Sequence, residues 1–201
     1  MSIHTKIHLS ERELKLVTDS EWILTKHVII QKIYDLFGAL LEDMKLENAN
    51  LPILNNSILK NNGKISKGEN YLGLPYIILD YPNYFTKENI YAIRTMFWWG
   101  NFFSSTLHVK GIFKNQISNS PDKFFSFLKS NDYSICINNN EWEHHSNENN
   151  YLRSEDLNKE KLDRILQKDF IKISKPLPLI EWDNGYDFLL QSYRRLREFR
   201  I

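Results

Sequence analysis

The stretch that decides the fold is Tyr91-Ala92-Ile93-Arg94-Thr95-Met96-Phe97-Trp98-Trp99, then Gly100-Asn101, then Phe102-Phe103-Ser104-Ser105-Thr106-Leu107-His108-Val109-Lys110. Two runs rich in aromatic and β-branched residues flank a short Gly-Asn segment. This pattern predicts a tight β-hairpin over about residues 90–113, at the centre of the fold. Neither run carries a recognisable catalytic or cofactor motif, so the stretch predicts an architecture and not a reaction.

The composition is that of a globular chain with one core. A length of 201 residues suffices for one substantial domain. Hydrophobic residues make up 42% and aromatic residues 13%, which excludes disorder for most of the chain. The 26 Lys and Arg residues nearly balance the 25 Asp and Glu residues, for a net charge of +1. This balance removes the electrostatic attraction expected of a dedicated nucleic-acid binder, so nucleic acid is disfavoured as a partner.

The cysteine content and the hydropathy indicate a reducing compartment. With Cys136 as its single cysteine, the chain can form neither an intramolecular disulfide nor a cysteine-based zinc cage. The N-terminus lacks the apolar run of a signal peptide, and no segment approaches the roughly 18 apolar residues that span a bilayer. We therefore expect a soluble, cytoplasmic protein with no membrane partner.

The first fifty residues are predicted to be helical. Ser10 is followed three residues later by Glu13, which is the spacing of a capping box. A longer helix is expected from Asp19 or Ser20, and it should pack against the sheet. Its apolar residues recur at three-to-four spacing: Trp22, Ile23, Ile29, Ile30, Ile33, Leu36, Phe37, Leu40, Leu41 and Met44.

The segment from Asn48 to Tyr71 is polar and irregular, which favours loop and turns with a short strand at Ile65. The apolar run Tyr76–Leu79 follows, with Pro75 and Pro82 on its two sides. It is predicted to be a buried strand whose prolines lie at its ends, where no ladder donor is missing.

Two interpretations of residues 86–93 stay open. Thr86 could cap a helix that runs through Ile90, Tyr91 and Ile93. The composition of residues 90–99, rich in β-branched and aromatic side chains, favours the strand instead.

The C-terminal half alternates between helix and strand. Ser120-Pro121-Asp122 is a helix start. The expected elements are a helix from Ser120, a strand over 133–137, a polar loop over 141–150, a helix over 154–167, a strand over 170–173 and a helix from Asp183 to the end.

This order of elements predicts the fold class. We expect an α+β fold in which a mostly antiparallel sheet packs against the long N-terminal helix and the C-terminal helices. The chain should form a single domain over 1–201, with a helical segment (1–50), a sheet core (64–138) and a mixed C-terminal part (150–201).

The hairpin register assigns side chains to two faces. If Gly100-Asn101 is a two-residue loop, the numbers of paired residues add up to 201, so that Ile93 faces His108. One face is then mostly apolar, with Ala92, Arg94, Met96, Trp98, Phe103, Leu107 and Val109. The other combines aromatic rings, hydroxyls and an imidazole, on Tyr91, Thr95, Phe97, Trp99, Ser104, Thr106 and His108.

The second face has two interpretations. Aromatic walls holding hydroxyls and an imidazole are suited to bind a ligand. The same residues also suit a sheet face half covered by helices, because Thr and Ser are common in cross-strand pairs. We favour this second interpretation, in which the face packs against helices and binds no ligand.

Arg94 lies on the opposite face from His108 in this register, which argues against a joint site unless a bulge intervenes. Among apolar neighbours a buried arginine needs a carboxylate, and Asp80 and Glu88 are candidates. The alternative role of Arg94 is anion binding.

No cofactor or metal is predicted. The glycines at positions 63, 68 and 73 fit neither a phosphate loop nor a dinucleotide fingerprint. Glu141, Glu143 and His145 alternate as metal ligands on a strand could, but among asparagines they are better explained as a solvated loop.

Three functions remain as hypotheses. The leading one is a non-catalytic domain that binds a small molecule or a protein through the aromatic sheet face. The second is a small hydrolase- or transferase-like enzyme with His108 as general acid or base and Asp80 or a serine as its helper. The third is weak nucleic-acid binding through the C-terminal arginines Arg194, Arg195, Arg197 and Arg200. A homodimer formed through an exposed sheet edge also stays open.

Overall fold

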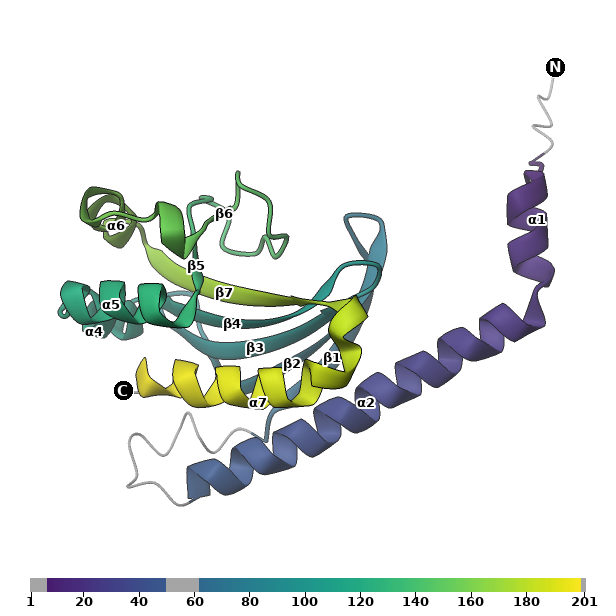
Figure 1. Ribbon diagram of the computed structural model, residues 1–201, viewed down its shortest axis with the longest axis horizontal. Coiled ribbons are helices and arrows are strands. Elements are labelled where there is room, and N and C mark those ends of the chain that lie inside the picture. The colour runs from purple at the N-terminus through teal and green to yellow at the C-terminus, as the bar shows by residue number, and fades with distance from the viewer. Residues whose placement is uncertain (1–6, 50–61, 200–201) are drawn as a thin grey trace. The chain divides into compact units, whose positions relative to one another are not determined.

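The computed structural model describes residues 7–49 and 62–199 of the chain (Figure 1). Contacts divide the chain into two compact units, one ending at Leu36 and one beginning at Phe37. The boundary falls inside one long helix, so that helix contributes to both units.

Helices precede, interrupt and follow the strands in the described part of the chain. The α-helices are α1 (Glu11–Thr18), α2 (Ser20–Ala49), α4 (Ile112–Ser118), α5 (Pro121–Asn131), α6 (Lys159–Leu166) and α7 (Gly185–Leu196), and the 3₁₀ helices are η1 (Ser154–Asp156), η2 (Leu179–Asn184) and η3 (Arg197–Phe199). The capping box is confirmed, since Ser10 and Glu13 bond each other's backbone N–H groups. The long helix begins at Ser20, one of the two predicted start sites.

The strands form one seven-stranded sheet in the order β1-β2-β3-β4-β7-β5-β6. They are β1 (Lys64–Tyr71), β2 (Leu74–Phe85), β3 (Ile90–Trp98), β4 (Phe102–Lys110), β5 (Ser134–Cys136), β6 (Tyr151–Leu152) and β7 (Phe170–Pro178). Every pairing in it is antiparallel. The predicted α+β fold with an antiparallel sheet, a central hairpin and a long N-terminal helix is therefore confirmed.

One face of the sheet carries the hydrophobic core. Helix α7 runs across this face and packs on β3, β4 and β7 (Figure 1). The part of α2 from Phe37 onward belongs to the second unit, and its side chains Phe37, Leu40 and Met44 are buried. Asn48 near the end of α2 donates to the hydroxyl of Tyr81 on β2 (3.2 Å). Burying this apolar surface is the main source of the fold's stability.

The predicted hairpin register is wrong by one residue. Trp98 pairs with Phe102 and Arg94 pairs with Thr106, so the numbers of paired residues add up to 200. The turn takes three residues because the Trp99 N–H donates to the Pro75 carbonyl on β2 (3.1 Å) instead of pairing with β4. Gly100 occupies the turn with a φ of +69°, where glycine is favoured.

A one-residue shift moves every side chain of one strand to the other face relative to its neighbour. Arg94 and His108 therefore lie on the same face, contrary to the prediction. The aromatic face predicted to line a ligand site is divided: Tyr91, Thr95 and Phe97 are buried in the core, whereas Ser104, Thr106 and His108 are on the opposite face.

The strands extend further than the sequence indicated. Pro82 lies inside β2, where the register with β3 shifts between Asp80 and Asn83, a place where a missing N–H is tolerated. Pro176 and Pro178 likewise lie within β7 and not beyond it. Thr86 begins no helix, because residues 90–98 form β3. The predicted loop over 48–71 falls partly outside the described residues, and its last part is the eight-residue strand β1. Within the described ranges no helix is long and apolar enough to cross a membrane.

Candidate functional site

The face opposite the core carries ionisable side chains from four neighbouring strands. We call it the polar face, defined by Asp80 (β2), Arg94 (β3), Thr106 and His108 (β4), and Lys172 and Ser174 (β7). These six residues are direct cross-strand partners, which is why they line up across the sheet. The chain from 137 to 150, which we call the covering loop, joins β5 to β6 on this side of the sheet (Figure 1).

Arg94 is held by Asp80 in a two-pronged ion pair. Its Nε lies 2.8 Å from Asp80 Oδ1 and its Nη2 lies 2.9 Å from Oδ2. Both side chains are largely buried. Of the two carboxylates considered from the sequence, Asp80 is therefore the partner. This geometry is the strong form of an arginine–carboxylate contact.

Arg94 also determines the tautomer of His144 in the covering loop. Its Nη1 lies 3.0 Å from His144 Nε2, and a guanidinium can only donate, so Nε2 accepts and the ring proton resides on Nδ1. Burial, with Arg94 and Lys172 nearby, lowers the pKa of His144 well below its usual value. His144 is thus a neutral hydrogen-bond donor through Nδ1 at physiological pH.

His108 is held by a carboxylate of the covering loop. Its Nε2 lies 3.0 Å from Glu141 Oε2, and Glu141 Oε1 accepts from Lys110 Nζ (2.9 Å). Burial lowers the pKa of His108, while the bond to His108 lowers the pKa of Glu141 to about 2. A neutral His108 therefore donates through Nε2 to an ionised Glu141.

Lys172 lies at the centre of this arrangement with 1% of its surface exposed. Its Nζ donates to the carbonyls of Glu141 (2.8 Å) and Glu143 (2.5 Å) in the covering loop. Burial is the main reason that the pKa of Lys172 falls to about 8. The buried ammonium thereby attaches the covering loop to the sheet.

Tyr71 of β1 holds the covering loop from its other side. Its hydroxyl accepts the N–H groups of His144 (2.7 Å) and His145 (2.9 Å) and donates to Glu143 Oε2 (3.0 Å). Residues 141–145 are therefore not the solvated loop expected from the sequence. They are bonded to side chains on β1, β3, β4 and β7.

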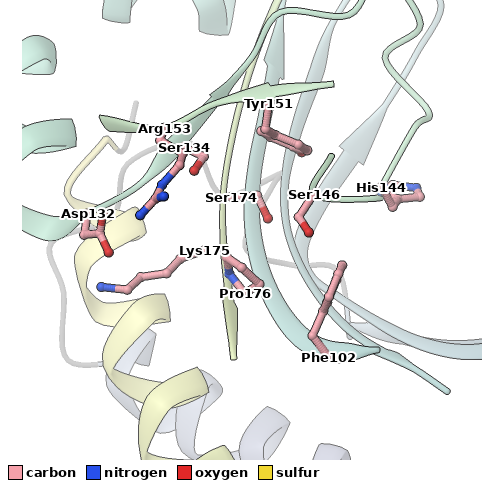
Figure 2. Close-up of a pocket in the computed structure, with 10 residues that line it drawn as sticks. All are labelled: Phe102, Asp132, Ser134, His144, Ser146, Tyr151, Arg153, Ser174, Lys175 and Pro176. Carbon is pink, nitrogen blue, oxygen red and sulfur yellow. The ribbon is translucent and has the colours of Figure 1, made fainter. Parts of the chain in front are cut away.

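A cavity of about 320 Å³ lies beside the polar face (Figure 2). Its walls carry four hydroxyls, one imidazole, two cations, one carboxylate and two apolar side chains. They are Ser134, Ser146, Ser174, Tyr151, His144, Arg153, Lys175, Asp132, Phe102 and Pro176. Figure 2 shows Asp132, Arg153 and Lys175 at one end and His144, Ser146 and Phe102 at the other. The volume suits a small metabolite.

The existing bonds of the lining residues leave mostly donors for a ligand. The carboxylate of Asp132 already accepts from Ser154 Oγ (2.9 Å). Ser174 Oγ lies 2.8 Å from Thr106 Oγ1 on the polar face. Burial raises the pKa of Tyr151 well above its usual value, so this hydroxyl keeps its proton.

The two cations also have partners: Lys175 Nζ donates to the Asn131 carbonyl (2.9 Å), and Arg153 Nη1 lies 2.9 Å from Glu155 Oε1. Each cation has further N–H donors, so the lining as a whole favours a ligand rich in acceptors.

The site residues predicted from the sequence are only partly brought together. Asp80, Arg94, Thr106 and His108 belong to the polar face, and Ser104 lies on the same side of β4 as Thr106. None of these five residues lines the cavity. Trp99 lies in the hairpin turn with its ring against Phe97 (5.3 Å).

The C-terminal arginines are not one open basic cluster. Arg194 Nε and Arg197 Nη1 lie 2.5 and 3.0 Å from the two carboxylate oxygens of Glu47. Arg195 lines a separate cavity, and Arg200 lies outside the described residues.

Sequence reasoning missed the covering loop as a part of the site. Glu141, Glu143 and His145 were considered only as metal ligands or as solvated residues. One signal was present: residues 137–150 contain three glutamates and no Lys or Arg, while the neighbouring strands carry Arg94, Lys110 and Lys172. Within the described residues, no group of three or more His, Cys, Asp and Glu side chains is arranged to hold a metal ion.

Comparisons with protein-family models, with curated proteins and with solved structures find no match to this chain.

Proposed function

We propose that the protein binds a small ligand with a carboxylate or phosphate group in the cavity beside the polar face. The observation that carries this proposal is the imbalance of its lining. Four hydroxyls, the Nδ1–H tautomer of His144 and the cations Arg153 and Lys175 line the cavity with one carboxylate, Asp132, and Arg153 is also paired with Glu155. Such a lining offers donors to an anion, and Phe102 and Pro176 offer an apolar surface to the rest of the molecule.

Binding without turnover fits the two histidines better than catalysis does. The Nε2 lone pair of His144 is taken by Arg94, so this atom is not available to remove a proton from a ligand. His108 Nε2 is bonded to Glu141, and His108 does not line the cavity. We therefore retain the non-catalytic ligand-binding function as the leading proposal, with its site moved from the aromatic face to this cavity.

The test is a titration of ¹⁵N-labelled protein, followed by NMR, with inorganic phosphate and separately with benzoate. We expect saturable shifts of the Ser134, Ser146 and Ser174 amides with at least one of these anions. Lys175→Met should weaken that binding by about 10- to 150-fold, since a charge-assisted contact contributes about 1.5–3 kcal/mol. Lys87→Met is the matched control, because Lys87 is exposed and lies outside the cavity.

The two anions distinguish the ligand classes. Saturation by phosphate alone indicates a phosphorylated ligand, and saturation by benzoate alone indicates an aromatic or aliphatic carboxylate. Non-saturable shifts with both anions, or an equal loss of affinity in Lys87→Met and Lys175→Met, would refute the proposed site.

A further inference from the structure

The first unit exposes an apolar helix face that its own residues do not bury. Helix α1 has no buried residue, and Leu14 and Val17 on it are exposed. At the start of α2, Trp22 is 44% exposed and Ile23 is 39% exposed. Leu24 and Val28, on the other side of α2, are exposed as well. Apolar side chains exposed in this number on one segment are typical of an interaction site.

The spacing shows that these residues form one face. Positions 19, 22, 23, 26, 29 and 30 recur at the three-to-four interval that places side chains on one side of a helix. The same interval continues along α2 to Phe37, Leu40 and Met44, which are buried in the second unit. The face therefore has the pattern of a buried helix surface over its whole length, including the part that is exposed.

Two opposite charges lie on this face. Asp19, which precedes α2 and caps it through Oδ1 (2.9 Å to the Trp22 N–H), and Lys26 are seven residues apart, which is two helical turns. In an antiparallel pair of identical helices centred between Trp22 and Ile23, Asp19 of each copy lies level with Lys26 of the other. A parallel pair would instead place Lys26 beside Lys26.

We propose that this face binds the same face of a second copy of the chain, antiparallel and related by a two-fold axis at Trp22 and Ile23. In such an isologous contact the same surface of each copy faces the other, and Asp19 of each copy pairs with Lys26 of the other copy. Trp22 at its centre is the residue type that most often dominates an interface. The contact does not depend on the ligand-binding function proposed above.

The charges of α1 disfavour an anionic membrane as the occupant. A helix that lies on such a membrane carries Lys and Arg on its polar side. Helix α1 instead sets Glu11 and Glu13 against Arg12 and Lys15. A second copy, which offers both signs of charge, is the better match.

The test is sedimentation equilibrium of the full chain across the micromolar range. We expect a reversible dimer whose dissociation constant rises about 100-fold in Ile23→Glu, because a charge then enters the centre of the contact. Leu24→Glu is the matched control: Leu24 is 62% exposed on the other side of the same helix, so the same substitution should leave the dimer intact. If Ile23→Glu disrupts the helix, Ile23→Ala replaces it as the test, and circular dichroism confirms that this variant keeps its helicity.

The orientation is tested by a double-mutant cycle of Asp19→Asn, which keeps the capping oxygen, and Lys26→Gln. Antiparallel pairing predicts that the two substitutions are coupled, so that the double variant loses less affinity than the two single losses combined. A monomer at all concentrations, a dimer unaffected by Ile23→Glu, or equal effects of Ile23→Glu and Leu24→Glu would each overturn the proposal. Co-sedimentation of a monomer with phosphatidylserine vesicles would overturn it in favour of a membrane surface.

Discussion

At the scale of single residues, Lys172 has the most unusual environment in the polar face. It is almost completely buried, and its ammonium contacts two backbone carbonyls of the covering loop instead of a carboxylate. Charge-assisted bonds to carbonyls offset part of the desolvation cost, and the lowered pKa of Lys172 measures what is left uncompensated.

This burial predicts an unusual dependence of stability on pH. The folded-state pKa of Lys172 is about 8, below the ordinary value of 10.5. Between these values the unfolded chain binds more protons than the folded one, so the free energy of unfolding rises with pH. We expect a rise of about 2–3 kcal/mol between pH 8 and 10 from this group, measured by urea unfolding. Above pH 10 the buried tyrosines oppose the trend, because burial raises the pKa of Tyr133 to about 12.

Lys172→Gln should abolish this slope while keeping a donor for one of the carbonyls. The matched control is Lys123→Gln, at an exposed position on α5. A slope that survives in Lys172→Gln would assign the pH dependence to another group.

Arg94 and Asp80 provide a second test at this scale. Removing one partner of a buried pair leaves an uncompensated charge, so Arg94→Met should lower the free energy of unfolding by about 3–5 kcal/mol. In the double variant Asp80→Leu/Arg94→Met neither charge is left alone, and most of this loss should be recovered. Chemical denaturation of the two single variants and the double variant measures the coupling. Additive losses would show that the pair contributes nothing as a pair.

At the scale of elements, the covering loop has more polar contacts with the sheet than its sequence suggested. Tyr71→Phe removes one hydroxyl that accepts two loop N–H groups. We expect amide exchange at residues 143–146 to become about 10–100 times faster, since each buried donor left without a partner costs about 1–3 kcal/mol. Hydrogen exchange followed by mass spectrometry detects this change.

Tyr76→Phe is the control for this experiment, because the Tyr76 ring packs edge-on against Tyr71 at 6.2 Å on the neighbouring strand. It should leave the exchange of the loop unchanged. Equal acceleration in both variants would mean that the effect is not specific to the Tyr71 hydroxyl, and that its two bonds do not hold the loop.

The elements also show which predictions a sequence can support. The capping box of Ser10 and Glu13 was predictable because its partners are three residues apart. The hairpin was predictable as an element, but its register depends on a bond between Trp99 and Pro75, which belong to different hairpins. The candidate site was out of reach for the same reason, because Glu141 and His108 are 33 residues apart. Local chemistry predicted the elements, and contacts between distant segments determined the faces.

At the scale of the whole molecule, the fold class could be predicted from the order of helical and strand patterns along the sequence. This order is unaffected by the one-residue error in the predicted hairpin register. The sheet separates two kinds of interior: an apolar core under α7 and an ionic layer under the covering loop. The two layers differ in what holds them together. The core depends on apolar area, whereas the ionic layer depends on having every charge paired.

The ionic layer also determines how strong an electrostatic field this side of the sheet produces in the solvent. Arg94 on the sheet is paired with Asp80, and Lys110 is paired with Glu141 of the covering loop, both at short range, while the buried ammonium of Lys172 contacts backbone carbonyls of that loop. Opposite charges this close cancel within a few ångströms, so little field reaches the solvent from this side. Diffusing anions are therefore not steered by these paired residues of the polar face, and their contribution to an association rate should depend only weakly on ionic strength.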